Sequence, residues 1–271
     1  MNAKVDEKTQ LILYKDPIWK GLLYLSFPVF LVNILKTLHD IVDGIFLGQV
    51  KGAEIATSMQ SAVALTWPIF FIFISFGMGL SVAGNALIGQ YVGKGDYLNA
   101  KKYANNTVFI ALFLGVLFTI AAFVLAPTIL TLMGAEGTDK EFAITYLRIR
   151  SFELPILFLI FAFEAVRRAT GDTVTPVIVN AIGILLNIIL TPILVLGLNM
   201  GVTGAALSTV AAHVVILPAV IFFLLKSKKS ITIKFNFKHL NKVIIKDIFD
   251  IGIPASAGQS IQAVGFVILN S

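Results

Sequence analysis

The sequence predicts an all-α integral membrane protein with six complete transmembrane helices and the beginning of a seventh. Of its 271 residues, 57% are hydrophobic and only 13% are charged, about half the charged share of an average soluble domain. The apolar residues also fall into runs of the length that a membrane-spanning helix needs, roughly 20 residues. Together these features exclude a chain made of two ordinary soluble domains.

The expected elements follow one another with short loops between them. Residues 1–18 are polar and mixed in charge, so we expect a cytoplasmic tail. The first apolar run is long and has no small-residue cleavage site after a short apolar core, which favours a retained helix over a signal peptide. The six predicted spans are 19–47, 55–80, 104–132, 142–166, 174–197 and 202–225. A basic linker, 226–247, separates them from a seventh span that is still apolar where the chain stops, 248–271.

Lysine and arginine are distributed unevenly among the predicted loops. If the N-terminus is cytoplasmic, sixteen of the 21 lie on the cytoplasmic side, within 4–20, 94–102, 167–168 and 226–246. Cytoplasmic loops of membrane proteins carry this excess, and basic loops beside the membrane attract anionic lipids. We therefore expect a multi-pass protein with its N-terminus inside, in contact with membrane lipids and with no nucleic-acid partner.

An internal repeat relates the two ends of the chain. The segment from Lys20 to Pro28 resembles the segment from Lys246 to Pro254, since each has a proline eight residues after a lysine and apolar residues at matching positions. Six spans separate the copies, so both enter the membrane in the same direction. Parallel repeats of this kind form the two halves of several transporter folds, and chance similarity between membrane helices is the alternative.

The first predicted span carries four ionisable residues on one helical face: Lys36, His39, Asp40 and Asp43. A charged side chain at membrane depth costs about 2.5–3.5 kcal/mol on insertion scales. Lys36 can reach Asp40 and His39 can reach Asp43, because each pair is one turn apart. Two explanations fit: a self-neutralising structural cluster, or a proton or Na⁺ site that faces a cavity.

Later spans contain further polar side chains at membrane depth. Each has a structural alternative, because interfacial charges and hydrogen bonds between helices are common in membrane bundles. The candidates are Glu164 in the fourth span, Asn187 and Thr191 in the fifth, and Thr209 in the sixth. Arg150 and Glu153, also in the fourth span, are expected to pair with each other.

Several kinds of chemistry lack their sequence motifs. Because the chain has no cysteine, it forms no disulfide or thiolate metal site. The segment 89–95 has neither the spacing nor the Ser or Thr of a phosphate-binding loop, and no HExxH or GxSxG sequence occurs. We therefore expect a protein that is not an enzyme and that uses no cofactor apart from a bound ion.

Short motifs spread over nearly the whole chain resemble those of the multidrug and toxic compound extrusion (MATE) transporters, especially their prokaryotic DinF-like branch. Each motif is weak alone, but their order is specific. They are Ser26–Pro28, Asp43–Gly44, Gly89–Asp96, Arg168–Pro176, Asn187–Pro192 and Gly201–Ala206. The resemblance implies a twelve-helix fold of two six-helix lobes, with the N-terminal lobe at 19–225 and the start of helix 7 at 248–271.

The resemblance also implies a buried site for the coupling ion, H⁺ or Na⁺. Its cation-binding residues would be Asp43, Glu164, Asn187, Thr209, Asp40 and His39, with Lys36 and Thr191 as charge or hydrogen-bond partners and Pro28 as a hinge. Na⁺ would bind at Asp43 and Asn187. Similar transporters often have a second aspartate where this chain has Thr191, so Glu164 would have to restore the missing carboxylate.

On these grounds we expect a secondary antiporter of the prokaryotic inner membrane. It would export organic cations or other amphipathic small molecules in exchange for H⁺ or Na⁺, together with a C-terminal lobe that the chain lacks. A lipid-linked oligosaccharide flippase of the same superfamily is the closest alternative, and a basic central cavity would favour it. The third alternative is a half-transporter fragment that does not transport.

Overall fold

The computed structural model describes residues 17–50, 52–226, 231–233 and 240–270. Every regular element within these ranges is helical. The elements are α2 (Ile18–Gly48), α3 (Ala53–Gly93), α4 (Tyr97–Leu132), α5 (Gly137–Ser151), α6 (Leu154–Ala169), α7 (Val174–Pro192), the π-helix η1 (Ile193–Gly197), α8 (Gly201–Leu225) and α9 (Lys242–Asn270). Nearly all of the predicted N-terminal tail and much of the predicted linker lie outside the described residues.

The helices follow the predicted spans in order, but several of them extend beyond the predicted bounds and one span is divided. α3 continues to Gly93 instead of ending near residue 80, and α9 begins at Lys242, inside the predicted linker. Hydropathy marks the apolar part of a helix, whereas polar turns continue the same helix into the interface. The fourth span is divided into α5 and α6, because Pro155, at the start of α6, has no N–H to continue the hydrogen-bond ladder.

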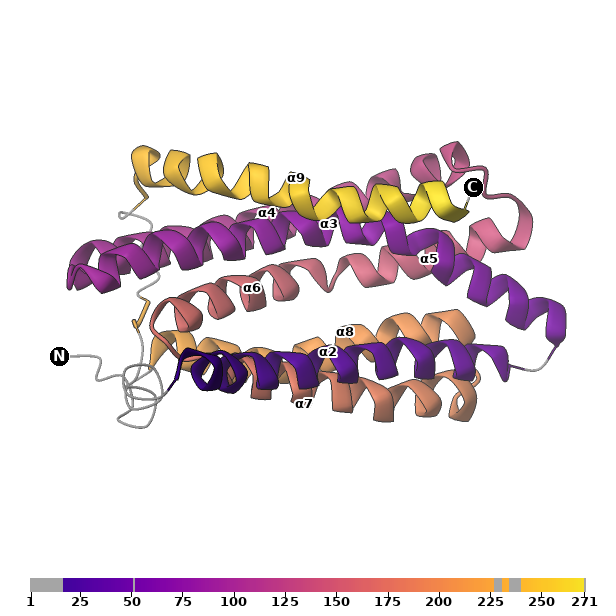
Figure 1. Cartoon of the computed structure of the whole chain (residues 1–271). Coiled ribbons are helices and arrows are strands. Elements are labelled where there is room, and N and C mark those ends of the chain that lie inside the picture. Colours follow the sequence, from indigo (N-terminus) through magenta and orange to yellow (C-terminus); the bar gives the residue numbers. More distant parts are fainter. Residues whose placement is uncertain (1–16, 51, 227–230, 234–239, 271) are drawn as a thin grey trace.

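The helices form two groups with α5 and α6 running between them (Figure 1). α3 packs against α4 and α9, whereas α2 and α8 both pack against α7. Among the described residues, four helical segments are long and apolar enough to cross a membrane: α3, α4, α7 with η1, and α8. These segments confirm the predicted all-α membrane fold.

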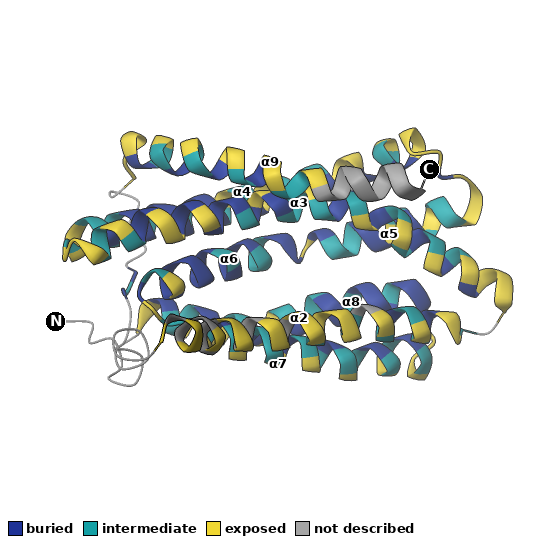
Figure 2. Ribbon diagram, in the orientation of Figure 1, coloured by how far each residue is buried: buried dark blue, intermediate teal, exposed yellow. Residues whose placement is uncertain are grey.

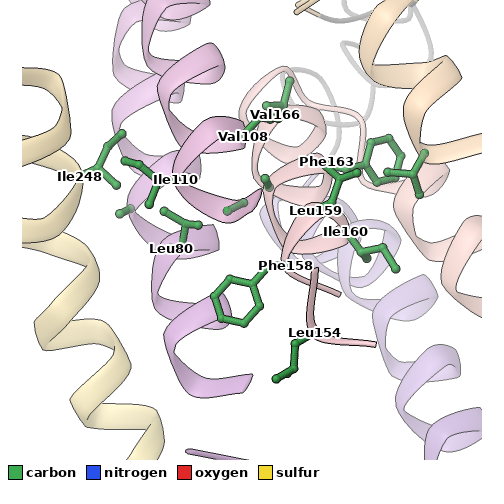
Figure 3. Close-up of a cluster of buried hydrophobic side chains, with 14 of the residues drawn as sticks. Leu80, Val108, Ile110, Leu154, Phe158, Leu159, Ile160, Phe163, Val166 and Ile248 are labelled. Atoms are coloured by element: carbon green, nitrogen blue, oxygen red, sulfur yellow. The ribbon is translucent and has the colours of Figure 1, made fainter. Parts of the chain in front are cut away.

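The hydrophobic core is centred on α6, which is dark over most of its length in Figure 2. Phe158 and Phe163 are completely buried there; side chains from α3, α4 and α9 lie on the Phe158 side of α6, whereas the Phe163 ring points the other way (Figure 3). Glycine permits this close packing, since a Cβ on Gly77 would collide with the ring of Phe161. Small residues at helix contacts are the usual means of association within a bilayer.

One end of the bundle, on the left in Figure 1, collects the lysine-rich connections, and we call it the basic end. It contains the turn between α3 and α4, the turn between α6 and α7, and the beginning of α9. In the first of these turns, Gly95 has a φ of 73° and Asp96 caps α4 by accepting a hydrogen bond from the backbone N–H of Asn99 at 3.1 Å. This bond, with a second from the Asn99 side chain, holds the pKa of Asp96 below its usual range.

Gly79 is where the backbones of α3 and α9 approach most closely. A Cβ at this position would collide with the carbonyl oxygen of Gly252 and with Ser256. We expect Gly79→Ala to destabilise the protein by about 1–3 kcal/mol, the usual cost of overpacking. Gly89→Ala, in the same helix, is the matched control because its Cβ would meet nothing within 4 Å. Thermal unfolding of both purified variants measures the difference, and equal stability would contradict the close α3–α9 contact.

Candidate functional site

Asp43 is buried where α2 meets the end of α7, with 8% of its surface exposed. The Thr191 hydroxyl lies 2.8 Å from its Oδ1. The Nε2 of His39, one turn earlier in α2, lies 3.4 Å from its Oδ2. Both carboxyl oxygens therefore have a polar neighbour, and the predicted contact between His39 and Asp43 is present.

Thr191 connects Asp43 to polar side chains one turn earlier in α7 and on α8. Its hydroxyl oxygen lies 3.0 Å from the Asn187 Oδ1 and 3.0 Å from the Ser208 hydroxyl. The Asn187 amide then donates to the Thr209 hydroxyl at 2.9 Å. The structure thus joins three of the predicted site residues, Asp43, Asn187 and Thr209, through Thr191.

The Thr191 hydroxyl has too few protons for the acceptors around it. It carries one hydrogen, whereas an ionised Asp43 carboxylate and the Asn187 carbonyl are both acceptors at hydrogen-bond distance. Both are satisfied when Asp43 is protonated and donates to Thr191, or when the Asn187 amide turns over and presents its NH₂ group. The network therefore has two hydrogen-bond arrangements, and a proton on Asp43 selects between them.

Backbone irregularity places these side chains together. α7 ends at Pro192 and continues into the wider turn of η1, where the N–H of Leu198 donates to the Ile193 carbonyl at 2.9 Å. Gly204 lets α8 approach this turn, because a Cβ there would lie 2.8 Å from the backbone carbon of Leu194. Short π-helical turns are frequent at functional sites. In this lobe the turn brings α8 close enough for its hydroxyls to reach α7.

A second polar cluster surrounds the break between α5 and α6. The Arg150 Nε lies 2.7 Å from the Glu153 Oε2, as expected for this pair, and an Arg150 terminal nitrogen donates to the Tyr146 hydroxyl at 2.9 Å. The other Glu153 oxygen lies 3.6 Å from the His213 Nδ1, which is 2.9 Å from the Thr209 carbonyl. Thr209 therefore belongs to both clusters, with its side chain in one and its backbone in the other.

Glu164 does not join the Asp43 network. Its carboxylate accepts from the Asn180 amide at 2.6 Å and lies 3.0 Å from an Arg168 nitrogen, near the basic end. Asn180 and Thr191 are eleven residues apart in α7, about 16 Å along the helix axis. Glu164 is therefore too distant to replace a carboxylate at Thr191, and its own assignment to the ion site stays a prediction.

The remaining predicted residues lie in α2. Lys36 is exposed, whereas the side chains of Asp40 and Pro28 lie outside the described set. The beginning of α2 turns out of line with the rest of the helix (Figure 1). The role of Pro28 as a hinge stays a prediction that agrees with this bend.

The sequence analysis missed four residues of these clusters: Ser208, Asn180, Tyr146 and His213. Ser208 directly precedes Thr209, and Asn180 lies two turns before Asn187 on the same face of α7. His213 follows Thr209 by one turn. Extending each predicted site residue along its own helical face would have identified Asn180 and His213, and Ser208 is the sequence neighbour of a predicted residue.

The part of the chain that the structure describes contains no group of three His, Cys, Asp or Glu residues able to hold a metal ion. The two oxygens expected to bind Na⁺, on Asp43 and Asn187, both contact the Thr191 hydroxyl. The chemistry at this site is therefore that of one carboxyl group among hydroxyls, an amide and an imidazole.

The site thus lies in a helical membrane lobe and consists of a buried carboxyl group in a network of hydroxyls and an amide. The family model described as MatE matches residues 28–193. This match covers more than half of the chain, and the chain belongs to that family.

Known proteins resemble the chain over nearly its whole length. The "Multidrug export protein MepA" of Staphylococcus haemolyticus is 29% identical over 265 residues, which are 96% of this chain and 57% of that relative. The outward-facing structure of a multidrug resistance MATE family transporter is 27% identical with a TM-score of 0.85, and the match covers 98% of this chain and 58% of that one. The inward-facing structure is 28% identical with a TM-score of 0.78, over 86% of this chain and 52% of that one. The chain thus spans little more than half the length of its relatives.

Replacing Thr191 by the isosteric valine removes the hydroxyl between Asp43 and Asn187. We expect a loss of about 1–3 kcal/mol in unfolding free energy, because buried acceptors are left without a donor. Thr131→Val is the matched control, since that exposed hydroxyl bonds only the Pro127 carbonyl within its own helix. Denaturant unfolding in detergent compares the two, and equal losses would show that Thr191 adds no stability of its own.

Proposed function

We propose that the complete protein is a secondary antiporter that exports amphipathic or cationic small molecules in exchange for H⁺. Membership of the MatE family supports this, as does the relative named a multidrug export protein. The observation that carries the proposal is the contact between the buried Asp43 carboxyl group and the Thr191 hydroxyl, in a network whose hydrogen bonds would differ between the charged and the neutral form of Asp43. Asp43 is the residue that takes up and releases the coupling ion.

The composition of the site favours H⁺ over Na⁺. Asp43 has a hydroxyl at one oxygen and an imidazole at the other, so a proton satisfies the network without further ligands. A second carboxylate at Thr191 would have favoured a metal cation, and Glu164 lies too far away to supply it. Na⁺ coupling remains an outcome of the test below.

Protonation of Asp43 would change what holds α2 in place. The charged form competes with Asn187 for the Thr191 hydrogen, and the neutral form donates its own. A ligand shifts a two-state equilibrium by its differential affinity for the two states. In our proposal the two states of α2 differ in its bend near Pro28, so that proton and substrate compete for one lobe cavity.

We propose that the basic end is cytoplasmic and that the protein lies in a prokaryotic plasma membrane with its N-terminus inside. The lysines at the α3–α4 turn and the start of α9 support this orientation. A C-terminal lobe would complete the transport path, because the relatives are nearly twice as long as this chain.

One observation favours the flippase alternative and another disfavours it. Lys36 is exposed on α2, where an ammonium group could bind a phosphate. Arg150, in contrast, is neutralised by Glu153 at 2.7 Å, and Arg148 lies over the Phe123 ring. The pairing of Arg150 removes one of the positive charges that a basic cavity would need, which supports export of cations.

Asp43→Asn removes the titrating group while keeping its shape. In inverted vesicles that contain the complete protein, we expect uptake of a fluorescent organic cation under a pH gradient to fall about tenfold or more, the size of effect typical for a group that transfers protons. Asp250→Asn is the matched control, because Asp250 is exposed and paired with Lys246.

The same vesicles test the choice of ion. Uptake that follows an imposed Na⁺ gradient instead of the pH gradient would assign Na⁺ to the site. Undiminished uptake by Asp43→Asn would remove Asp43 from the coupling mechanism. A folded wild-type protein that transports no organic cation under either gradient would favour the flippase.

A further inference from the structure

α9 is attached to the rest of the lobe by three polar contacts spread along its length. The Tyr103 hydroxyl of α4 donates to the Asp247 Oδ2 at 2.5 Å. The backbone N–H of Asn241, just before α9, donates to the Asn106 Oδ1 at 3.2 Å. Further along α9, the Ser260 hydroxyl lies 2.7 Å from the Ser75 hydroxyl of α3.

The contact of Tyr103 with Asp247 is the strongest of the three. A hydrogen bond to a carboxylate is roughly twice as strong as one between neutral groups. The Tyr103 side chain is only 6% exposed and its ring stacks on Tyr91 of α3, with 5.0 Å between centroids. α3, α4 and α9 therefore meet at the Tyr103 phenol. Its stacking on Tyr91 holds the ring in place independently of the hydrogen bond to Asp247.

The middle of the α3–α9 contact contains small residues. Gly79 faces Gly252 and Ser256, and Ser256 donates its own hydroxyl back to the Gly252 carbonyl of the same helix. A surface of small residues permits close approach. Nearer the start of α9, Ile244 and Ile248 are buried in the hydrophobic core, so apolar packing and polar contacts together hold α9.

The chain as a whole matches the outward-facing structure more fully than the inward-facing one. The match to the outward-facing structure leaves 2% of the chain uncovered, far less than the 29 residues of α9, so most of α9 is included. The inward-facing structure is matched over less of the chain and with a lower TM-score.

From this geometry we propose that Tyr103 and Asp247 form a latch that keeps the basic end closed while the transporter faces outward. The latch rests on the proposed function, since it acts in an alternating transporter. In the proposed function α9 opens a C-terminal lobe, so it separates from α3 and α4 together with that lobe. Opening toward the basic end breaks the phenol–carboxylate hydrogen bond, and closing restores it.

The test uses a disulfide between α3 and α9 as the readout of separation. The chain contains no cysteine, so Ser75→Cys with Ser260→Cys introduces one defined pair, with side-chain oxygens 2.7 Å apart in the wild type. In the complete protein in membranes, we expect Tyr103→Phe and Asp247→Asn each to slow oxidative cross-linking about fivefold. This factor corresponds to about 1 kcal/mol, the usual net worth of a hydrogen bond.

Two matched variants control for unspecific effects. Tyr97→Phe removes an exposed phenol at the start of the same helix α4, and Asp250→Asn removes an exposed carboxylate of α9 that is bound by Lys246. Both should cross-link at the wild-type rate. If Tyr103→Phe and Asp247→Asn also cross-link at that rate, the latch does not exist. Each variant removes one partner of the same hydrogen bond, so the other still tests the latch if one of them fails to fold.

A transport assay on the same cysteine pair separates this inference from the proposed function. The cross-linked protein should stop exporting and recover after reduction, because α9 can no longer leave α3. Export that continues in the cross-linked state would overturn the latch while leaving the antiporter intact. If the reduced pair and the wild type both fail to export, the proposed function fails, whereas the cross-linking rates still report on the contact.

Discussion

The structure depends on one constraint: a buried polar group within a bilayer finds its partners inside the protein. Asp43 is the sharpest case, because its carboxyl group is buried and meets Thr191 of α7. That contact attaches α2 to the α7–α8 pair. In the proposed mechanism, the bond that positions the helix is also the bond that a proton changes.

The two polar clusters are connected through α8. Thr209 accepts from Asn187 with its side chain and faces His213 with its carbonyl, so one turn of helix lies between the Asp43 network and the Glu153 carboxylate. Coupling between sites travels through contiguous contacts that have two discrete arrangements. In the Asp43 network, the two possible hydrogen-bond arrangements around Thr191 are of this kind. The divided helix α5–α6 lies at the Glu153 cluster.

The sequence predicts what depends on length and on spacing within one helix. The apolar runs gave the order of the helices because the bilayer sets their minimum length, and the contacts of His39 with Asp43 and of Arg150 with Glu153 follow from positions one turn apart. Contacts between helices were harder to predict. Ser208 joins the site because Gly204 lets α8 approach η1, and Glu164 stays away because Asn180 is two turns closer to the basic end than Asn187. Such distances arise from packing, which no local pattern records.

The length of α3 has a practical consequence. Its 41 residues extend about 60 Å at 1.5 Å per residue, roughly twice the hydrocarbon thickness of a bilayer. α3 and α4 also reach further at the basic end than α6, α7 and α8 do (Figure 1). Their hairpin therefore extends past the neighbouring helices at the basic end (Figure 1) and is tied to the core of the lobe. A marker protein fused in helical register at this turn would give electron microscopy a fixed feature for aligning an otherwise small and featureless particle.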